Sequence, residues 1–261
     1  MLETQITLAA PWYPRGELTR VKRLLPQLQS LYGDIVIALR ERSPETPEVS
    51  KWFDDNGVRY QLFEGWSGRH VCVGMAVERD ATFIHYCDFD RILRWIECHP
   101  AELSETIRRI PEQDLLVMGR TEFAWETHPR SMFETESLFN TVFSHYFDRT
   151  IDFGAGSRGL SQSAAEFVLE HTTHSEALIM DSAWSVLLKR GGFTWGYVEV
   201  DGLEWESADQ HKDAAATREE QQDLADRSDA SAKNWQLRTQ VARKILNFGL
   251  QAITQPLEAK E

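Results

Sequence analysis

Short apolar runs alternate with segments of helical periodicity along the first 120 residues. Four apolar runs have the length and composition of strands, at 5–10, 34–39, 58–63 and 82–86. The segments between them, such as 17–32, place apolar residues three and four apart, as an amphipathic helix does. Strands that alternate with helices form a mainly parallel sheet with helices on both faces. Ligands of such sheets bind beyond the carboxyl ends of the strands, so the loops after strands are the first places to search for a site.

The second half of the chain is less regular. It contains strand-like runs at 114–119, near 151–153 and near 194–200, and helical patterns at 134–147, 161–171 and 181–190. Between 207 and 233, Leu224 is the one large apolar residue, which is typical of a mobile loop or a solvated helix. We therefore predict a single α/β domain over 1–206, a polar connector over 207–233, and a basic C-terminal helix and tail over 234–261.

Composition and net charge narrow the classes of function that fit the chain. The 261 residues include 28 Lys and Arg against 41 Asp and Glu, a formal net charge of −13. Phosphate backbones repel such a chain, so small molecules or cations suit it better than nucleic acid. The cysteines, Cys72, Cys87 and Cys98, form no paired motif, which indicates a reducing compartment. No signal peptide or membrane span is recognisable, so we expect a cytoplasmic protein, at most peripheral to a membrane.

Two carboxylates, Asp88 and Asp90, directly follow the fourth predicted strand. A pair at this spacing can share one hard divalent cation through oxygen ligands, and Mg²⁺ or Mn²⁺ held in this way keeps positions open for substrate phosphates. The alternative is structural, because either aspartate could cap the helix that follows. His211, after Asp209 in the polar connector, is a candidate third metal ligand or a solvated loop residue.

The segment Gly154-Ala-Gly-Ser-Arg-Gly159 matches a dinucleotide fingerprint by letter. A true fingerprint joins a strand directly to a helix and has an acidic residue about twenty positions later. Here the candidate strand is short and contains Asp152, so close backbone packing or a simple turn explains the glycines better. A Rossmann-type oxidoreductase or methyltransferase that uses this loop stays open as an alternative function.

Asp181 follows the apolar run 177–180 and precedes an amphipathic helix. Its structural role would be that of a helix cap. A carboxylate at this edge of a sheet could instead act as a general base, if an acceptor hydroxyl comes within hydrogen-bond reach. The chain has neither the nucleophile elbow of serine hydrolases nor a Walker loop, which removes support from those classes.

The order of these motifs resembles that of the family-2 glycosyltransferases, nucleotide-sugar enzymes of the GT-A fold. The resemblance runs from Ile6 to Glu206 as an order of motifs. It rests on the first strand with its Pro11-Trp-Tyr13 loop, Gly68-Arg69 at the start of a helix, Cys87–Asp90, the glycine-rich segment 153–161, and Met180-Asp181 with the helix and glycines at 187–192.

The resemblance implies a metal-dependent, inverting transfer of a sugar from a nucleotide-diphosphate donor to a hydroxyl acceptor. Pro11 and Tyr13 would lie against the nucleotide. Asp88 would bind the donor and, with Asp90, the Mn²⁺ or Mg²⁺ ion. Asp181 would be the catalytic base that deprotonates the acceptor.

Further residues are assigned to the donor by position or by charge. Glu41 is the possible counterpart of the family's acidic residue after the second strand, and Arg69 or Arg158 could reach the diphosphate. Trp66, Trp125 and Trp184 could stack on sugar faces or belong to the core. The family usually has an acid before its base, whereas this chain has Met180 there. A non-catalytic nucleotide-sugar-binding or interaction module therefore stays open as a second alternative.

The last predicted helix, 234–253, has basic residues and no acidic ones. Leu237, Val241, Ile245 and Phe248 fall on one face, while Trp235, Leu246, Leu250 and Ile253 gather on roughly the opposite side. Two apolar sides predict a helix packed between the domain and something else, such as a second copy of the chain. The alternative is a basic helix in peripheral contact with an anionic membrane.

Overall fold

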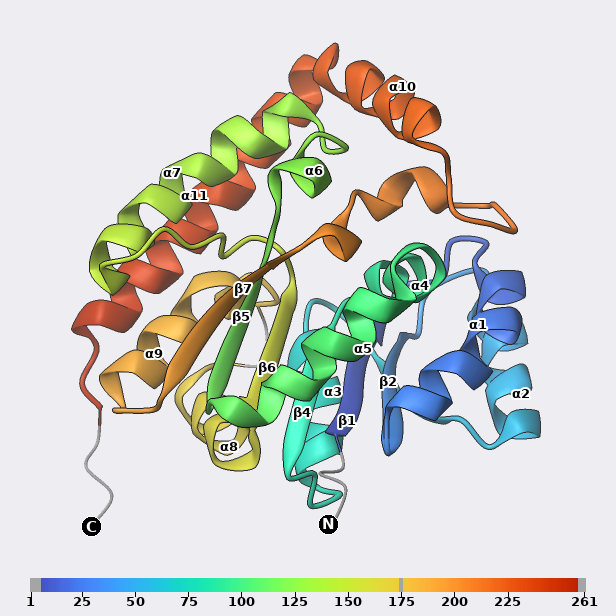
Figure 1. Ribbon diagram of the computed structural model, residues 1–261, viewed down its shortest axis with the longest axis horizontal. Helices are drawn as coiled ribbons and strands as arrows, with labels where there is room; N and C mark the ends of the chain where they lie inside the picture. Colours follow the sequence, from blue (N-terminus) through green and yellow to red (C-terminus); the bar gives the residue numbers. More distant parts are fainter. Residues whose placement is uncertain (1–5, 174–175, 258–261) are drawn as a thin grey trace.

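A computed structural model describes residues 6–173 and 176–257, and its centre is one seven-stranded sheet (Figure 1). The strands lie in the order β3-β2-β1-β4-β6-β5-β7. β6 runs antiparallel to β4 and β5, and all other neighbours are parallel. The carboxyl ends of the parallel strands therefore meet at one edge of the sheet. The strands are β1 Ile6–Trp12, β2 Asp34–Arg40, β3 Arg59–Phe63, β4 Phe83–Cys87, β5 Leu115–Arg120, β6 Ser157–Ser161 and β7 Trp195–Val200.

Helices cover both faces of this sheet, which makes an α/β domain with three layers (Figure 1). The helices are α1 Leu18–Leu31, α2 Thr46–Asn56, α3 Gly68–Val77, α4 Phe89–Cys98, α5 Pro100–Arg109, α6 Glu122–Trp125, α7 Arg130–Phe147, α8 Gln162–His171, α9 Ser185–Arg190, α10 Arg218–Asp229 and α11 Ala232–Thr254. Short 3₁₀ turns are η1 Ile110–Glu112, η3 Asp201–Leu203 and η4 Glu206–Asp209, and η2 Met180–Trp184 is a single wide π turn.

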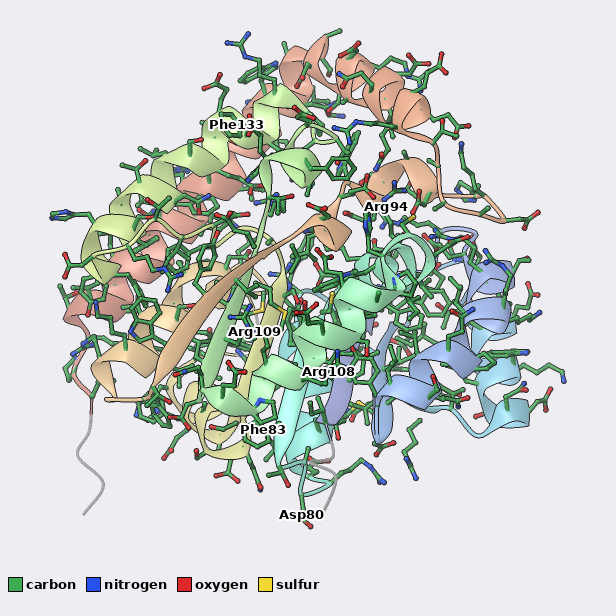
Figure 2. The ribbon with its side chains drawn as sticks, in the orientation of Figure 1. Asp80, Phe83, Arg94, Arg108, Arg109 and Phe133 are labelled. Atoms are coloured by element: carbon green, nitrogen blue, oxygen red, sulfur yellow. The ribbon has the colours of Figure 1, made fainter. Side chains whose placement is uncertain are left out.

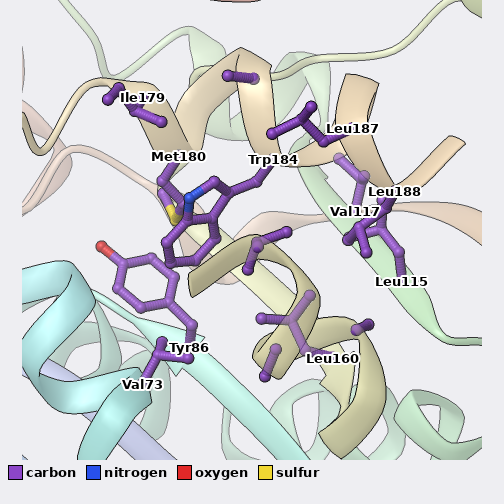
Figure 3. Packing of buried hydrophobic residues seen from close by; sticks show 14 of the residues in the cluster. Val73, Tyr86, Leu115, Val117, Leu160, Ile179, Met180, Trp184, Leu187 and Leu188 are labelled. Atoms are coloured by element: carbon purple, nitrogen blue, oxygen red, sulfur yellow. The ribbon is translucent and has the colours of Figure 1, made fainter. Parts of the chain in front are cut away.

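The apolar runs form strands that are buried on both faces, because successive side chains point to opposite sides. In β5, Leu115 and Val117 join the core under α3, α7, α8, α9 and α11, whereas Leu116 and Met118 join the core under α1, α2, α4 and α5. In the first of these cores, Tyr86 of β4 packs against Trp184 with ring centroids 6.3 Å apart (Figure 3). This packing fixes the ends of the strands from which the site is built.

The glycine-rich segment enters a strand, not a helix. Residues 151–153, predicted as a strand, are an extended loop, and the strand itself is β6, Ser157–Ser161. β6 runs antiparallel to both of its neighbours. A dinucleotide fingerprint needs a parallel strand that turns into a helix N-terminus, so the structure removes the basis for a Rossmann-type cofactor site here.

The polar connector is partly helical. Thr217 and Glu220 form a capping box that starts α10. α11 then packs along α7, where Gly249 allows the close approach of Phe143, and Ser182 donates a hydrogen bond to the carbonyl oxygen of Ile245 at 2.6 Å (Figure 1). Residues of both apolar sides pack on the domain core, although Leu237 of one side and Leu250 of the other are exposed. Contact with a second copy or with a membrane stays a prediction. In the described residues, no helix is long and apolar enough to span a bilayer.

One buried histidine of β4 gives the fold a pH dependence. Burial lowers the pKa of His85 to about 3, whereas an unfolded histidine has a pKa of about 6.5. Between these values the unfolded chain binds the additional proton, so stability falls as the pH falls. We expect His85→Gln to flatten the dependence of unfolding free energy on pH between 6 and 5 by about 1 kcal/mol per pH unit, measured by urea denaturation. The exposed His145→Gln control should keep the wild-type slope, and an unchanged slope in His85→Gln would contradict the assignment.

Candidate functional site

A cavity of about 440 Å³ opens at the carboxyl ends of β1, β2 and β4, the edge predicted from the strand order. Its walls combine exposed aromatic rings with arginines and carboxylates. The lining residues are Pro11, Trp12, Tyr13, Arg40, Arg42, Phe63, Gly65, Trp66, Gly68, Arg69, Asp88, Asp90, Ala177 and Glu206. Gly68 is required by the close packing here, because a Cβ at this position would lie 2.6 Å from the ring of Phe63.

Asp88 begins α4 but does not cap it. Its backbone has the N-cap conformation, yet its side chain makes no capping hydrogen bond. Instead it accepts hydrogen bonds from the Tyr86 hydroxyl and from Arg69. Gly156 lies close behind, where a Cβ would come within 3.0 Å of the Asp88 carboxylate. The glycine-rich segment thus makes room for the first aspartate of the predicted metal pair.

Arg69 joins the two ends of the predicted site. Its Nη2 donates to Asp88 Oδ2 at 3.1 Å, and its Nη1 donates to both carboxylate oxygens of Asp181 at 3.0 and 3.1 Å. Arg69 is at the start of α3 and Asp181 lies 112 residues later in η2. The sequence-predicted Asp88, Arg69 and Asp181 therefore form one continuous ion-paired group, of which Asp88 and Arg69 line the cavity.

Asp181 is 4% exposed and lies behind Arg69. It is not the cap residue of the turn that contains it. Burial raises its pKa, although the Arg69 guanidinium acts in the opposite direction. Arg69 occupies one lone pair on each of the two Asp181 oxygens, and a carboxylate offers about four such sites for hydrogen bonds. The role of Asp181 as catalytic base stays a prediction.

Asp90 lies in the first turn of α4 and forms an ion pair with Arg15. Burial, together with the nearby charge of Glu206, raises the pKa of Asp90 to about 7. Glu206 is also buried and lines the cavity; its Oε2 lies 3.4 Å from Arg91 Nε and has no hydrogen-bond partner in the described residues. Two carboxylates, Asp90 and Glu206, and their arginine partners thus meet at this side of the cavity.

The donor atoms on this wall suit a hard divalent cation. Asp88 and Asp90 offer carboxylate oxygens of the type that Mg²⁺ and Mn²⁺ bind, and the unpartnered Glu206 oxygen lies on the same wall. Across the described ranges, no three His, Cys, Asp or Glu side chains are already grouped to hold a metal ion. In this structure Arg15 and Arg69 balance the charge of the two aspartates instead.

Three predicted site residues lie elsewhere. Arg158 is fully buried, and its guanidinium donates to the carbonyl oxygens of Ser157, Phe153 and Asp181, so it lies behind the cavity wall and does not reach a diphosphate there. The side chain of Glu41 points to solvent and does not line the cavity. His211 is exposed on a turn against Gly16, away from the cavity wall. Chain order alone could not place these three side chains.

Trp66, a candidate stacking residue, is 70% exposed and lines the cavity, whereas Trp184 belongs to the core. Other cavity residues escaped the sequence reasoning. Arg40 and Arg42 line the wall next to Glu41, and a search for basic residues after the second strand would have found them. Arg15 and Glu206 carry no motif. They join the site because the loop after β1 and the segment after β7 meet there.

Comparisons with known proteins agree with this architecture. No family model and no curated protein sequence matches the chain. A solved structure of glucosyl-3-phosphoglycerate synthase from Mycobacterium tuberculosis is similar over 97% of this chain and 82% of its own, with a TM-score of 0.58 and 10% identity. A complex of that enzyme with Mn²⁺, uridine diphosphate and phosphoglyceric acid has a TM-score of 0.55 at 9% identity, over 97% of this chain and 80% of its own.

A third complex of the same enzyme, with Mn²⁺, UDP-glucose and phosphoglyceric acid, covers 97% of this chain and 81% of its own, with a TM-score of 0.52 and 9% identity. At this low sequence identity, the structural similarity shows that the chains share a fold. The predicted α/β architecture, with a mainly parallel sheet between layers of helices and a C-terminal helix, is confirmed, and the chain has the GT-A fold.

Proposed function

We propose that this protein is a glycosyltransferase that moves a sugar from a nucleotide-diphosphate donor to a hydroxyl acceptor. The observation that supports it most is the ion-paired group of Asp88, Arg69 and Asp181, whose first two members line a cavity at the carboxyl edge of a GT-A sheet. The similar solved enzyme was captured with uridine diphosphate, UDP-glucose and Mn²⁺, which makes these the first compounds to test.

The cavity divides into two chemically different parts. Pro11, Tyr13 and the exposed Trp66 offer flat apolar surfaces that suit a nucleobase, and Arg42 lies beside them. Arg69 lies beyond these rings, between two carboxylates, and is the fixed cation for the diphosphate. A nucleotide sugar placed in this order would bring its sugar near Asp181.

The negative charge of the chain makes a cation more useful at this site. Asp88 and Asp90 would hold Mn²⁺ or Mg²⁺, with Glu206 as the additional oxygen donor on the wall. When bound, the ion supplies positive charge that stabilises the diphosphate leaving group. Arg15 and Arg69 stand against the same carboxylates, so they hold the two aspartates in place and limit their repulsion.

An inverting transfer needs a base on the acceptor side. We assign this role to Asp181, because burial keeps its pKa raised and because it follows the loop that contributes Ala177 to the cavity. The acceptor is a hydroxyl compound, and phosphoglyceric acid, found in the similar enzyme, is a reasonable first acceptor for an assay.

A thermal-shift panel tests the proposal directly. Uridine, guanosine, adenosine and cytidine diphosphates and their sugar conjugates are compared with and without Mn²⁺. We expect one nucleotide to raise the melting temperature, and the rise to be larger with the metal. Release of nucleotide diphosphate during incubation with the donor separates an enzyme from a non-catalytic binding module. No response to any nucleotide would contradict the proposal.

Removing Asp90 should abolish the effect of the metal. We expect Asp90→Ala to weaken the Mn²⁺-dependent part of nucleotide affinity by about 10–100-fold or more, the range seen when groups that support a metal site are lost. Isothermal titration of the nucleotide diphosphate, with and without Mn²⁺, measures this. Asp55→Ala, an exposed carboxylate on α2, is the matched control. A Mn²⁺ dependence that survives in Asp90→Ala would refute the assignment.

A further inference from the structure

A second and larger cavity lies on the other half of the sheet edge. It has a volume of about 760 Å³ and is bounded by α6, α7 and the ends of β5 and β7; we call it the α7–β7 cleft. None of the residues of the first cavity lines it. In the sheet order, β6 lies between β4, whose end borders the first cavity, and β5, whose end borders this cleft.

One wall of the α7–β7 cleft is a buried charged group. Arg120 donates to Asp152 at 2.7 and 2.8 Å and to Glu136 at 2.6 Å, and its side chain is wholly buried. Its Nη1 has no hydrogen-bond partner in the part of the chain that the structure describes. Asn140 also donates to Asp152. Hydrogen bonds and ion pairs thus fix the side chains of this wall in place.

The opposite part of the cleft is aromatic. Trp125 stacks on the Arg120 guanidinium, whose carbon lies 3.4 Å from the ring centroid, and meets Phe133 edge to face with ring centroids 5.3 Å apart. Phe133 is 48% exposed, although it is a large apolar side chain at the start of α7 beside α6 (Figure 2). Trp125 is held in one orientation by Arg120 and leaves the remaining ring surface to the cleft.

Two of the four carboxylates that line the cleft form ion pairs with arginines. Asp152 is paired with Arg120, Glu126 forms an ion pair with Arg218, and Glu199 accepts a hydrogen bond from the Tyr197 hydroxyl at 3.2 Å. A phosphorylated ligand would be repelled, because four carboxylates and one already paired arginine line the cleft. A cationic ligand would have to compete with Arg120 and Arg218 for Asp152 and Glu126. The cleft is therefore suited to a neutral ligand.

We propose that the α7–β7 cleft binds a neutral saccharide. Sugars combine apolar C–H faces, which pack on rings such as Trp125 and Phe133, with hydroxyls that pair with amide, hydroxyl and carboxylate groups such as those of Asn140 and Glu199. This inference does not depend on the donor site, because saccharide binding is measured without a nucleotide.

The cleft and the donor cavity share one loop. Asp152 stands in the cleft wall, while the carbonyl oxygen of Gly156 accepts a hydrogen bond from the backbone of Asp88 at 3.4 Å. Five residues span at most about 18 Å, so a saccharide in the cleft would lie within that reach of the first cavity. A bound sugar chain and the donor site would thus face the same edge of the sheet.

Ligand-observed NMR with maltotriose tests binding. A comparison of glucose, glucosamine and glucose 6-phosphate tests whether the cleft prefers a neutral ligand. We expect maltotriose to bind saturably, and glucose to bind more tightly than either charged analogue. Phe133→Ala should weaken maltotriose about tenfold through the lost stacking surface. Leu138→Ala, an exposed apolar residue of the same helix outside the cleft, should leave affinity within about twofold of wild type.

A second variant distinguishes a loss of saccharide binding from misfolding. Thr141→Arg, at an exposed position of the cleft wall, fills the cleft without removing a core contact and should abolish maltotriose binding. Nucleotide affinity should be unchanged in both variants, which separates this proposal from that of the donor site. The proposal is overturned if no saccharide binds, if both variants bind maltotriose like wild type, or if a charged analogue binds more tightly than glucose.

Discussion

Replacing Arg120 with methionine is expected to lower the free energy of unfolding by about 3–5 kcal/mol, the cost of removing one partner from a buried ion pair. Asp152 and Glu136 lie within 3 Å of the Arg120 guanidinium and are themselves buried. The guanidinium counteracts the effect of burial on Asp152 and lowers the pKa of that carboxylate. Without the arginine, both acids must be protonated or remain charged in the interior, and either costs free energy. Chemical denaturation at neutral pH measures the loss.

The exposed pair of Arg130 and Glu134 provides the matched control for this effect. The Arg130 side chain is 76% exposed, so Arg130→Met should change stability by less than about 1 kcal/mol. Adding Glu136→Gln to Arg120→Met should recover part of the loss, because one unpaired acid is then removed. A loss below about 1 kcal/mol in Arg120→Met would show that the buried group contributes little.

The buried strands are the part of this fold that the sequence predicts best. Runs such as 34–39 are buried on both faces and therefore continuous in sequence, which makes them visible without a structure. β6 was misplaced because Ser157–Ser161 has polar residues and a glycine, and its burial comes from neighbours distant in sequence. Gly159, for example, packs against Ile110, a contact that no local pattern reveals.

The candidate site likewise contains some residues that the sequence predicts and others that it does not. Asp88 and Asp90 directly follow β4, and strand order alone brings residues of that kind to one edge. The apolar run before Asp181 is not a strand, so Asp181 meets Arg69 through the packing of η2. Glu206 reaches the cavity and Arg15 reaches Asp90 through loops, and the position of a loop depends on the packing of the whole domain. The guanidinium of Arg158 was expected at the surface of the site. It points inward because three backbone carbonyls accept its hydrogen bonds.

Asp181 could act as the catalytic base or could only position Arg69, and loss of either role would inactivate the enzyme. Asp181→Asn should lower kcat about 100- to 10,000-fold if the carboxylate removes a proton from the acceptor. Asparagine keeps an oxygen that can accept a hydrogen bond from Arg69, so the nucleotide should bind with little change. If Asp181 serves only to position Arg69, the variant should weaken nucleotide affinity, and kcat at saturating donor should fall much less.

Measuring kcat at saturating donor together with the nucleotide Kd distinguishes these cases. Arg69→Lys is the companion variant, since a lysine keeps the charge but loses the contacts made by the planar guanidinium to Asp88 and Asp181. It should raise the nucleotide Kd under either mechanism. A large fall in kcat with an unchanged Kd in Asp181→Asn therefore identifies a base, because Arg69 then still holds the donor. A rise in Kd of the size seen in Arg69→Lys, with kcat preserved, would instead make Asp181 the residue that holds Arg69 in place.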